Sequence, residues 1–259
     1  MKIAVIGAGA FGTALGGILA EKGHDIDYYD SKVEREKLSD VLKGAKLIVL
    51  AVPSKAVPYL LPHLPKNIPM IVATKGILSE SVFNDFKDFM VLSGPGFADD
   101  IKGHKQTILT ATDIRVIELF QTGYLSFDYT DDCQGVLMCG ALKNVYALLA
   151  GILGLERDSA EWEEFIDEIV TEMREVLAAN GGKRETVDLV CGVGDLRLTC
   201  GLPSRNYEFG SILRRDPTAK PEKTVEGISA LNKIKRGEIK VPAAAKNLQN
   251  LIERSKEWA

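Results

Sequence analysis

The sequence predicts an α/β protein in which a domain with a mainly parallel sheet is followed by an all-helical domain. Three observations carry this prediction: an apolar strand, a glycine-rich turn and a helix open the chain; strand-like runs then alternate with helical or loop segments; and strand-like runs almost disappear after residue 131. Such alternation is typical of a parallel sheet covered by helices on both faces. We therefore expect two domains, residues 1–131 and 132–259.

The bulk composition excludes several classes of protein. The 259 residues are 46% hydrophobic and 26% charged, with a formal net charge of −4, which argues against disorder and against a nucleic-acid-binding surface. The four cysteines and three histidines lack the spacing of metal ligands, so no metal site is expected. Reduced, buried thiols and a cytoplasmic location follow as expectations.

The uncharged stretch at residues 3–20 imitates a secretory signal or a membrane segment. Five glycines interrupt it, and each costs up to about 1 kcal/mol inside a helix. The stretch is also short for crossing a bilayer. We therefore expect neither a signal nor a membrane partner.

A glycine motif explains the same stretch better. Residues 3–6 form an apolar strand, residues 7–12 read GAGAFG, a G-x-G-x-x-G motif, and residues 13–21 are helix-like. Gly7 permits a tight turn, Gly9 lets a pyrophosphate approach the backbone, and Gly12 lets the helix pack on the strand. The helix N-terminus would face the phosphates. The motif predicts a Rossmann-type dinucleotide site that includes Ala10 and Phe11; the alternative is a turn that needs glycine for steric reasons only.

An acidic residue follows the second strand, residues 26–29. Asp30 lies eighteen residues after Gly12, where a carboxylate hydrogen-bonds the ribose hydroxyls of a dinucleotide. It would repel a 2′-phosphate, so we expect NAD. The neighbouring Ser31, Lys32 and Arg35 leave NADP open.

The remaining elements follow from apolar periodicity. Further strands are expected at 47–52, 70–73, 90–92, 107–110 and 125–129, with a short, proline-interrupted helix within 53–69. In the second domain, helices are expected at 137–153, 162–179, 207–214, 225–235 and 243–256.

Two polar stretches follow strands of the predicted sheet, where ligands of parallel sheets gather. Lys75 ends the run ATKG at residues 73–76, and SGPGFA at residues 93–98 forms a glycine-rich turn that brings backbone N–H groups near a ligand. The alternatives are a solvated lysine and an ordinary turn.

Two more polar stretches lie in the helical domain. Lys143 and Asn144 interrupt an apolar helix, where desolvation would bring a lysine pKa toward the acid–base range. A lysine that snorkels to the surface is the alternative. Asp195 and Thr199 share a helix face, and residues 204–206, SRN, make an anion-binding set whose alternative is a polar surface turn.

These motifs together resemble the NAD(P)-dependent glycerol-3-phosphate dehydrogenase family. The resemblance runs with gaps to about residue 245 and includes GAGAFG, AVPS, ATKG, SGPGFA, GALKN, GVGDLRLTC, SRN and VEG. It implies an oxidoreductase that interconverts dihydroxyacetone phosphate and sn-glycerol 3-phosphate with NAD(P)H, supplying phospholipid synthesis. Its partners would be a small phosphorylated substrate and, as one option, a second copy of the chain.

The resemblance also implies residue roles. Lys143 would be the general acid–base that reaches the substrate carbonyl, and Lys75 would orient and polarise the substrate. Asn144, Asp195 and Thr199 would line the reacting end. The implied substrate contacts are Lys75, Gly94, Gly96, Lys143, Asn144, Asp195, Ser204, Arg205 and Asn206. The implied cofactor contacts are Gly7, Gly9, Ala10, Phe11, Gly12, Asp30, Lys75, Ala98, Arg205 and Glu226.

The chain departs from the family in places. Gly96 stands where the family usually carries serine or threonine, and the segments 30–47 and 75–93 are short. The helical region after Gly151 lacks the family's usual stretch that contains glycine and asparagine. Two other functions stay open: a related dehydrogenase for another small hydroxy or keto acid, and a dinucleotide sensor without turnover.

Overall fold

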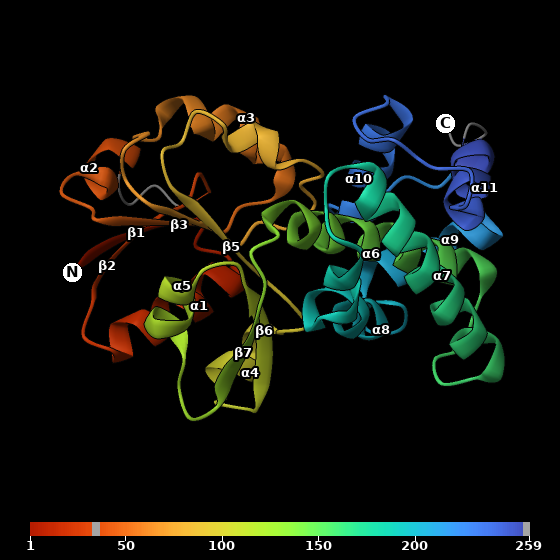
Figure 1. Cartoon of the computed structure of the whole chain (residues 1–259), viewed down its shortest axis with the longest axis horizontal. Helices are drawn as coiled ribbons and strands as arrows, with labels where there is room; N and C mark the ends of the chain where they lie inside the picture. The colour runs from red at the N-terminus through yellow and green to blue at the C-terminus, as the bar shows by residue number, and fades with distance from the viewer. Residues whose placement is uncertain (33–36, 256–259) are drawn as a thin grey trace. The chain divides into compact units, whose positions relative to one another are not determined.

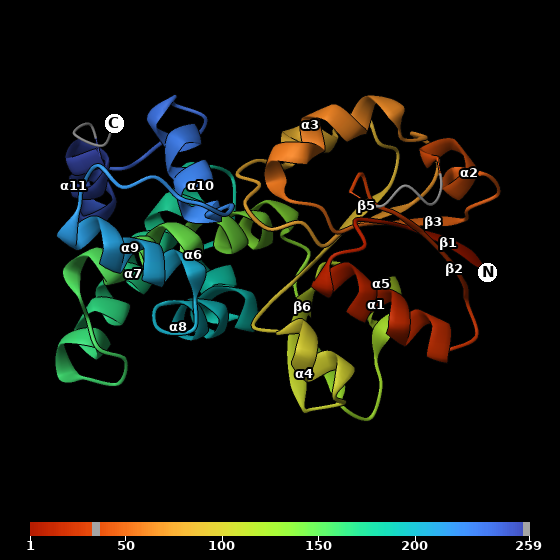
Figure 2. The same ribbon diagram turned by 180° about the vertical axis from the view of Figure 1, so that it is seen from behind.

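The computed structural model describes residues 1–32 and 37–255 and divides the chain into two compact units. The first unit contains Met1–Lys75 and Glu80–Cys133, and the second contains Gly76–Ser79 together with the chain from Gln134 onward (Figures 1 and 2). The short segment 76–79 therefore belongs with the helical unit, although the sequence prediction placed it in the first domain. Arg35, one of the residues near Asp30, lies outside the described residues.

The first unit is built on a seven-stranded sheet in the order β2-β1-β3-β4-β5-β6-β7. All neighbouring strands are parallel except β5 and β6, so the expectation of a mainly parallel Rossmann-type sheet is confirmed. The strands are β1 (Lys2–Ile6), β2 (Asp25–Tyr29), β3 (Leu47–Leu50), β4 (Met70–Val72), β5 (Phe89–Ser93), β6 (Thr107–Ala111) and β7 (Leu125–Tyr129).

Helices cover both faces of this sheet (Figure 1). They are α1 (Ala10–Glu21), α2 (Leu38–Leu42), α3 (Val57–Leu60), α4 (Ala98–Lys102) and α5 (Ile114–Phe120), with 3₁₀ turns at Ser54–Ala56, Leu61–His63 and Glu80–Phe83. The core lies between the strands and α1, where Leu15 and Leu19 contact fully buried strand residues such as Val5 and Val49. Burying these apolar side chains stabilises the edge from which the glycine turn projects.

The second unit is helical, as expected. It consists of α6 (Cys133–Leu153), α7 (Ala160–Ala179), α8 (Asp195–Thr199), α9 (Arg205–Arg215), α10 (Glu226–Lys235) and α11 (Lys246–Arg254), with a 3₁₀ helix at Arg184–Asp188 and a π-helical turn at Val190–Gly194. The predicted helix 243–256 begins later, at Lys246, because the Glu172 carboxylate accepts hydrogen bonds from the backbone N–H groups of Asn247 and Leu248 at that point.

Helix α6 is the core of the second unit. Every residue from Gln134 to Ile152 is buried, although the helix carries Lys143 and Asn144. By length and composition it is the one helix among the described residues that could cross a membrane, yet 94% of its most apolar window is covered by the protein itself. Burial of this kind identifies it as a core helix.

Candidate active site

The glycine turn of the first unit has the form of a phosphate cradle. Gly7 has φ +109° and a Cβ there would lie 2.5 Å from the Ala51 carbonyl oxygen, while a Cβ at Gly12 would lie 1.9 Å from the Gly7 carbonyl oxygen. Packing alone therefore requires glycine at these two positions. No atom lies within 4 Å of the position that a Cβ at Gly9 would take, so the space before the helix is open.

The start of α1 faces this open space with an uncompensated N-terminus. Gly9 is the N-cap, no side chain caps the helix, and its first turn contains no acidic residue. The helix begins at Ala10, three residues earlier than predicted, and includes Phe11 in its first turn. Free N–H groups and the positive end of the helix dipole suit an anionic pyrophosphate, so the residues present fit a dinucleotide.

Asp30 lies directly against the glycine turn. One of its carboxylate oxygens accepts a hydrogen bond from the Ala8 N–H at 3.1 Å, and the other accepts from the Lys32 N–H at 2.9 Å. The carboxylate is thus fixed beside the cradle, at the end of β2, where the ribose hydroxyls of a dinucleotide are expected.

Lys75 follows β4 and is half-buried rather than freely solvated. Its Nζ donates to the Gly94 carbonyl oxygen at 3.0 Å and lies 5.9 Å from the centre of the Phe11 ring. Three segments that are far apart in sequence, the glycine turn, the ATKG run and the SGPGFA turn, therefore meet around one ammonium group.

The SGPGFA turn explains the unusual glycine in it. A Cβ at Gly96 would lie 3.0 Å from a Leu109 methyl group, and Gly94 has φ +141° with the Leu109 Cα 3.1 Å from where its Cβ would be. A serine or threonine at position 96 would require Leu109 to move. Ala98 begins α4 directly after this turn.

In the second unit, Lys143 forms a buried ion pair. Its Nζ donates to Asp195 Oδ1 at 2.7 Å and to Thr199 Oγ1 at 2.9 Å, and the Thr199 hydroxyl in turn donates to the Asp195 carbonyl oxygen at 2.6 Å. Lys143 is 5% exposed and Asp195 1%, so the snorkelling alternative is wrong. Helices α6 and α8 thus bring together three residues that sequence reasoning had singled out in two separate motifs.

An amide chain continues from Asn144. The Asn206 side-chain NH₂ donates to Asn144 Oδ1 at 2.8 Å, and Asn206 Oδ1 accepts from the Gly227 N–H at 2.9 Å. These bonds join α6, α9 and α10, and glycine is required at 227 because a Cβ would lie 2.4 Å from the Asn144 carbonyl oxygen. These amide hydrogen bonds fix the first turns of α9 and α10, which begin at Arg205 and Glu226.

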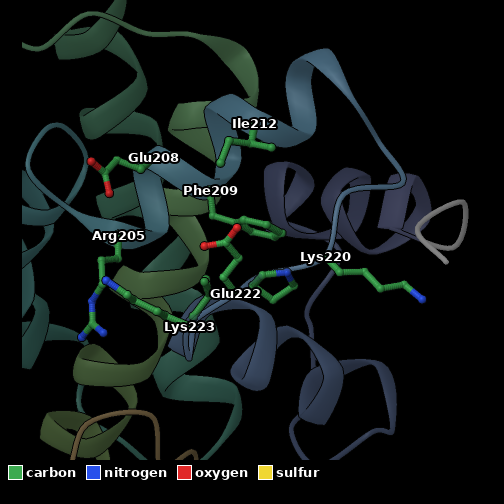
Figure 3. A pocket seen from close by; sticks show the side chains of 9 residues that line it. Arg205, Glu208, Phe209, Ile212, Lys220, Glu222 and Lys223 are labelled. Atoms are coloured by element: carbon green, nitrogen blue, oxygen red, sulfur yellow. The ribbon is translucent and has the colours of Figure 1, made fainter.

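Arg205 is exposed at the first position of α9, and Ser204 caps that helix by accepting from the Tyr207 N–H. It lines a pocket of about 360 Å³ whose apolar floor includes Phe209 and Val225. Figure 3 shows that Arg205 and Lys223 both line this pocket, together with Glu208 and Glu222. Sequence reasoning missed Lys223; the only signal was a pair of lysines, at 220 and 223, shortly before the VEG motif.

None of the four cysteines forms a disulfide. Cys139, Cys191 and Cys200 are buried and Cys133 is half-buried. Burial raises the pKa of the Cys200 thiol, which follows Thr199, to about 12, so it stays protonated at neutral pH. Among the residues that the structure describes, no group of histidine, cysteine and carboxylate side chains could hold a metal ion.

Sequence comparison places both units beside one family. The NAD-dependent glycerol-3-phosphate dehydrogenase N-terminus matches residues 2–37, and the C-terminus of the same family matches residues 132–256. A glycerol-3-phosphate dehydrogenase [NAD(P)+] of Leptospira biflexa is 33% identical over an alignment of 302 residues that covers 97% of this chain and 89% of the relative. Because this alignment is longer than the chain of 259 residues, the relative carries segments that this chain lacks.

Solved structures give the same result. A glycerol-3-phosphate dehydrogenase from Coxiella burnetii is similar with a TM-score of 0.79, 25% identity and 98% coverage of both chains. The Plasmodium falciparum glycerol-3-phosphate dehydrogenase, at 18% identity, has a TM-score of 0.84 over 99% of this chain and 92% of its own, which shows the shared fold. A ketopantoate reductase from Ralstonia eutropha is less similar, with a TM-score of 0.56 at 19% identity and 99% coverage of both chains.

Proposed function

The chain belongs to the NAD-dependent glycerol-3-phosphate dehydrogenase family, and from that premise we propose that Lys143 is the proton donor of its reaction. The reaction is the NAD(P)-dependent reduction of dihydroxyacetone phosphate to sn-glycerol 3-phosphate, which supplies phospholipid synthesis. The observation that carries the proposal is the buried Lys143 ammonium, held at 2.7 Å by Asp195 and at 2.9 Å by Thr199.

The chemistry needs a proton at one oxygen. When bound, NAD(P)H would supply the hydride that reduces C2 of the substrate, and negative charge would then develop on the carbonyl oxygen. The Lys143 ammonium stabilises this negative charge and transfers a proton to the oxygen, giving the alcohol. In the oxidation direction, the neutral amine takes the hydroxyl proton back. Asp195 and Thr199 hold Nζ in place for both directions.

Lys75 has a separate role in this proposal. Its ammonium, held by the Gly94 carbonyl oxygen, would orient the substrate and polarise its carbonyl.

The substrate phosphate would be bound by Arg205, with Lys223 as a second cation. No ion pair joins either side chain to any residue within 1–32 or 37–255, although Glu208 and Glu222 also line the pocket. Arginine binds phosphate oxygens with two parallel N–H donors, and a lysine adds a point charge. Asn206 and Ser204 support this end of α9 through its cap and through the amide chain.

The cofactor would lie on the first unit, with its pyrophosphate against Gly9 and the start of α1. NAD or NADP serves the family. We propose a preference for NAD because the fixed Asp30 carboxylate can accept hydrogen bonds from ribose hydroxyls and would repel a 2′-phosphate.

A dehydrogenase acting on a keto acid is the second candidate, because a ketopantoate reductase shares the fold. A pair of cations favours a phosphate dianion over a single carboxylate. The test is a steady-state assay of the purified protein with dihydroxyacetone phosphate, ketopantoate and short keto acids, each with NADH and NADPH. Turnover with ketopantoate but none with dihydroxyacetone phosphate would overturn the proposal, and tight NADH binding without any turnover would favour a sensor.

Two further expectations concern the compartment of the protein and its oligomeric state. Free cysteines support a reducing compartment such as the cytoplasm. The homodimer stays a prediction, which light scattering on the purified protein would test. A mass near twice 28.2 kDa would support a dimer, and a mass near 28.2 kDa would contradict it.

A further inference from the structure

Helix α8 carries both partners of Lys143 but is too short to hold itself. It spans five residues, Asp195–Thr199, and follows a π-helical turn at Val190–Gly194. Isolated helices of this length are unstable in water, so the position of its last turn depends on contacts from elsewhere. Asp195 is the first residue of α8 and Thr199 is its last.

Two side chains hold the carbonyl groups on either side of Thr199. Arg157 Nη2 donates to the Leu198 carbonyl oxygen at 2.6 Å, and the Trp162 indole Nε1 donates to the Cys200 carbonyl oxygen at 2.6 Å. Both donors come from one short stretch, residues 157–162, which leads from the turn before α7 into its first turn. The arginine bond is charge-assisted and therefore stronger than an ordinary hydrogen bond.

The packing around these donors leaves little freedom. Trp162 is 1% exposed, and the guanidinium of Arg197 lies 4.8 Å from the centre of its ring. A Cβ at Gly201 would lie 2.7 Å from Arg157 Nε, so glycine at that position lets the arginine approach. Neither Arg157 nor Trp162 bonds Lys143, Asp195 or Thr199 through its side chain.

We propose that Arg157 and Trp162 are positioning residues that fix α8 and thereby keep the Lys143 ammonium against Asp195. This inference rests on the proposed role of Lys143. Without either donor, the last turn of α8 would shift and the Lys143–Asp195 distance would lengthen.

A longer distance changes the proton affinity of Lys143. Its ammonium is paired with Asp195 on α8. The Cys200 thiol that follows α8 interacts electrostatically with Lys143, Asp195 and Arg157. A buried ammonium that loses part of its counter-charge has a lower pKa. Reduction requires the protonated amine, so the alkaline limb of the pH profile of kcat/KM would move to lower pH.

The kinetic test compares Arg157→Met and Trp162→Phe with wild type. We expect kcat to fall about tenfold, the effect of roughly one lost hydrogen bond, and the alkaline limb to move down by about half a pH unit or more. Arg157→Lys, which keeps a cationic donor, should recover part of both. NADH affinity should stay within about twofold, since the first unit is untouched. The control is Arg184→Met, which removes an exposed ion pair with Glu175 in the same unit and should behave as wild type.

A second measurement does not depend on turnover. In protein with ¹³Cε-labelled lysine, the Lys143 signal is assigned by its loss in Lys143→Met, and its titration is followed by NMR. A lower Lys143 pKa in Trp162→Phe, which changes no charge, supports the inference even if the wild type reduces no dihydroxyacetone phosphate, an outcome that would overturn only the proposed function. In Arg157→Met the lost cation by itself raises the Lys143 pKa, so a lower pKa there also supports the inference. Folded variants with a wild-type titration and wild-type kcat overturn the inference. If Trp162→Phe fails to fold, Arg157→Met and Arg157→Lys decide the question.

Discussion

Lys143 is a buried cation whose location has both a chemical and an energetic consequence. It lies on an otherwise apolar helix and its charge is matched by Asp195 at 2.7 Å. Removing one partner of a buried pair leaves the other uncompensated, which costs about 3–5 kcal/mol of stability. The pair is therefore a feature that packing alone would not favour, and its retention fits a role in proton transfer.

Replacing Lys143 separates the chemistry from cofactor binding. Lys143→Met should lower kcat for dihydroxyacetone phosphate by at least about 100-fold, the usual contribution of a general acid. NADH affinity, measured by fluorescence titration, should be nearly unchanged because the glycine turn lies in the other unit. An equal loss of NADH binding would instead indicate a structural role for the lysine.

Substitutions of Arg205 and Lys223, the two exposed cations proposed to bind the substrate phosphate, should affect KM rather than kcat. Arg205→Ala should raise KM for dihydroxyacetone phosphate by about tenfold to 100-fold, as expected for one lost charge-assisted bond, and Lys223→Ala should raise it by a smaller factor. Lys246→Ala, which changes an exposed lysine elsewhere in the unit, is the control. An unaltered KM in both variants would remove this pocket from phosphate binding.

Among the elements, the glycine turn offers a matched pair of substitutions. Gly9→Ala meets no neighbouring atom within 4 Å, so the fold should tolerate it while the added methyl group obstructs the pyrophosphate. Gly12→Ala places a Cβ 1.9 Å from a backbone oxygen and should disturb the fold itself.

Thermal unfolding and NADH titration read these two effects separately. Gly9→Ala should keep the melting temperature within a few degrees and weaken NADH binding by about tenfold or more. Gly12→Ala should lower the free energy of unfolding by about 1–3 kcal/mol, as overpacking does. If Gly9→Ala binds NADH as tightly as wild type, the open space before α1 is not the phosphate site.

Most helices and strands could be predicted from the sequence because apolar periodicity and glycine spacing involve residues that are close together along the chain. The strands of the first unit, the glycine turn and the apolar core helix follow from such short-range patterns. The start of α11 did not, because it depends on Glu172, a residue 74 positions before Lys246. The antiparallel pairing of β5 with β6 was likewise invisible, since apolar runs do not encode strand direction.

The candidate site divides along the same line. Lys143, Asp195 and Thr199 were recognised because polar residues in apolar or glycine-rich settings stand out, and family resemblance assigned their roles. Lys223, Arg157 and Trp162 were missed because nothing in their local sequence differs from an ordinary loop or helix start. Arg157 and Trp162 matter through their bonds to Leu198 and Cys200, and Lys223 through its place in the Arg205 pocket, which only the folded chain reveals.

For the molecule as a whole, burial should protect the thiols. The pKa of Cys200 is raised to about 12 and burial also raises that of Cys133, so both remain protonated, and hence weakly reactive, below those raised values. At pH 8 the native protein should react slowly with a thiol reagent, with the half-buried Cys133 first, whereas all four cysteines should react in urea. Fast reaction of all four in the native protein would contradict the buried positions; NADH-free and NADH-saturated samples should agree.

The four residues Gly76–Ser79 make the two units inseparable by a single cut. The segment sits between two stretches of the first unit, yet its carbonyl groups at Gly76 and Leu78 accept bonds from Lys233 and Gln134, and the side chains of Ile77 and Leu78 are buried. A fragment ending near residue 133 would contain this tetrapeptide without the helices that bury it. The exposed side chains of Ile77 and Leu78 would then promote aggregation. A chimaera that takes the first unit from a relative would likewise introduce that relative's version of segment 76–79, which is adapted to other helices. Substitutions in this segment and in the helices that bury it therefore have to match.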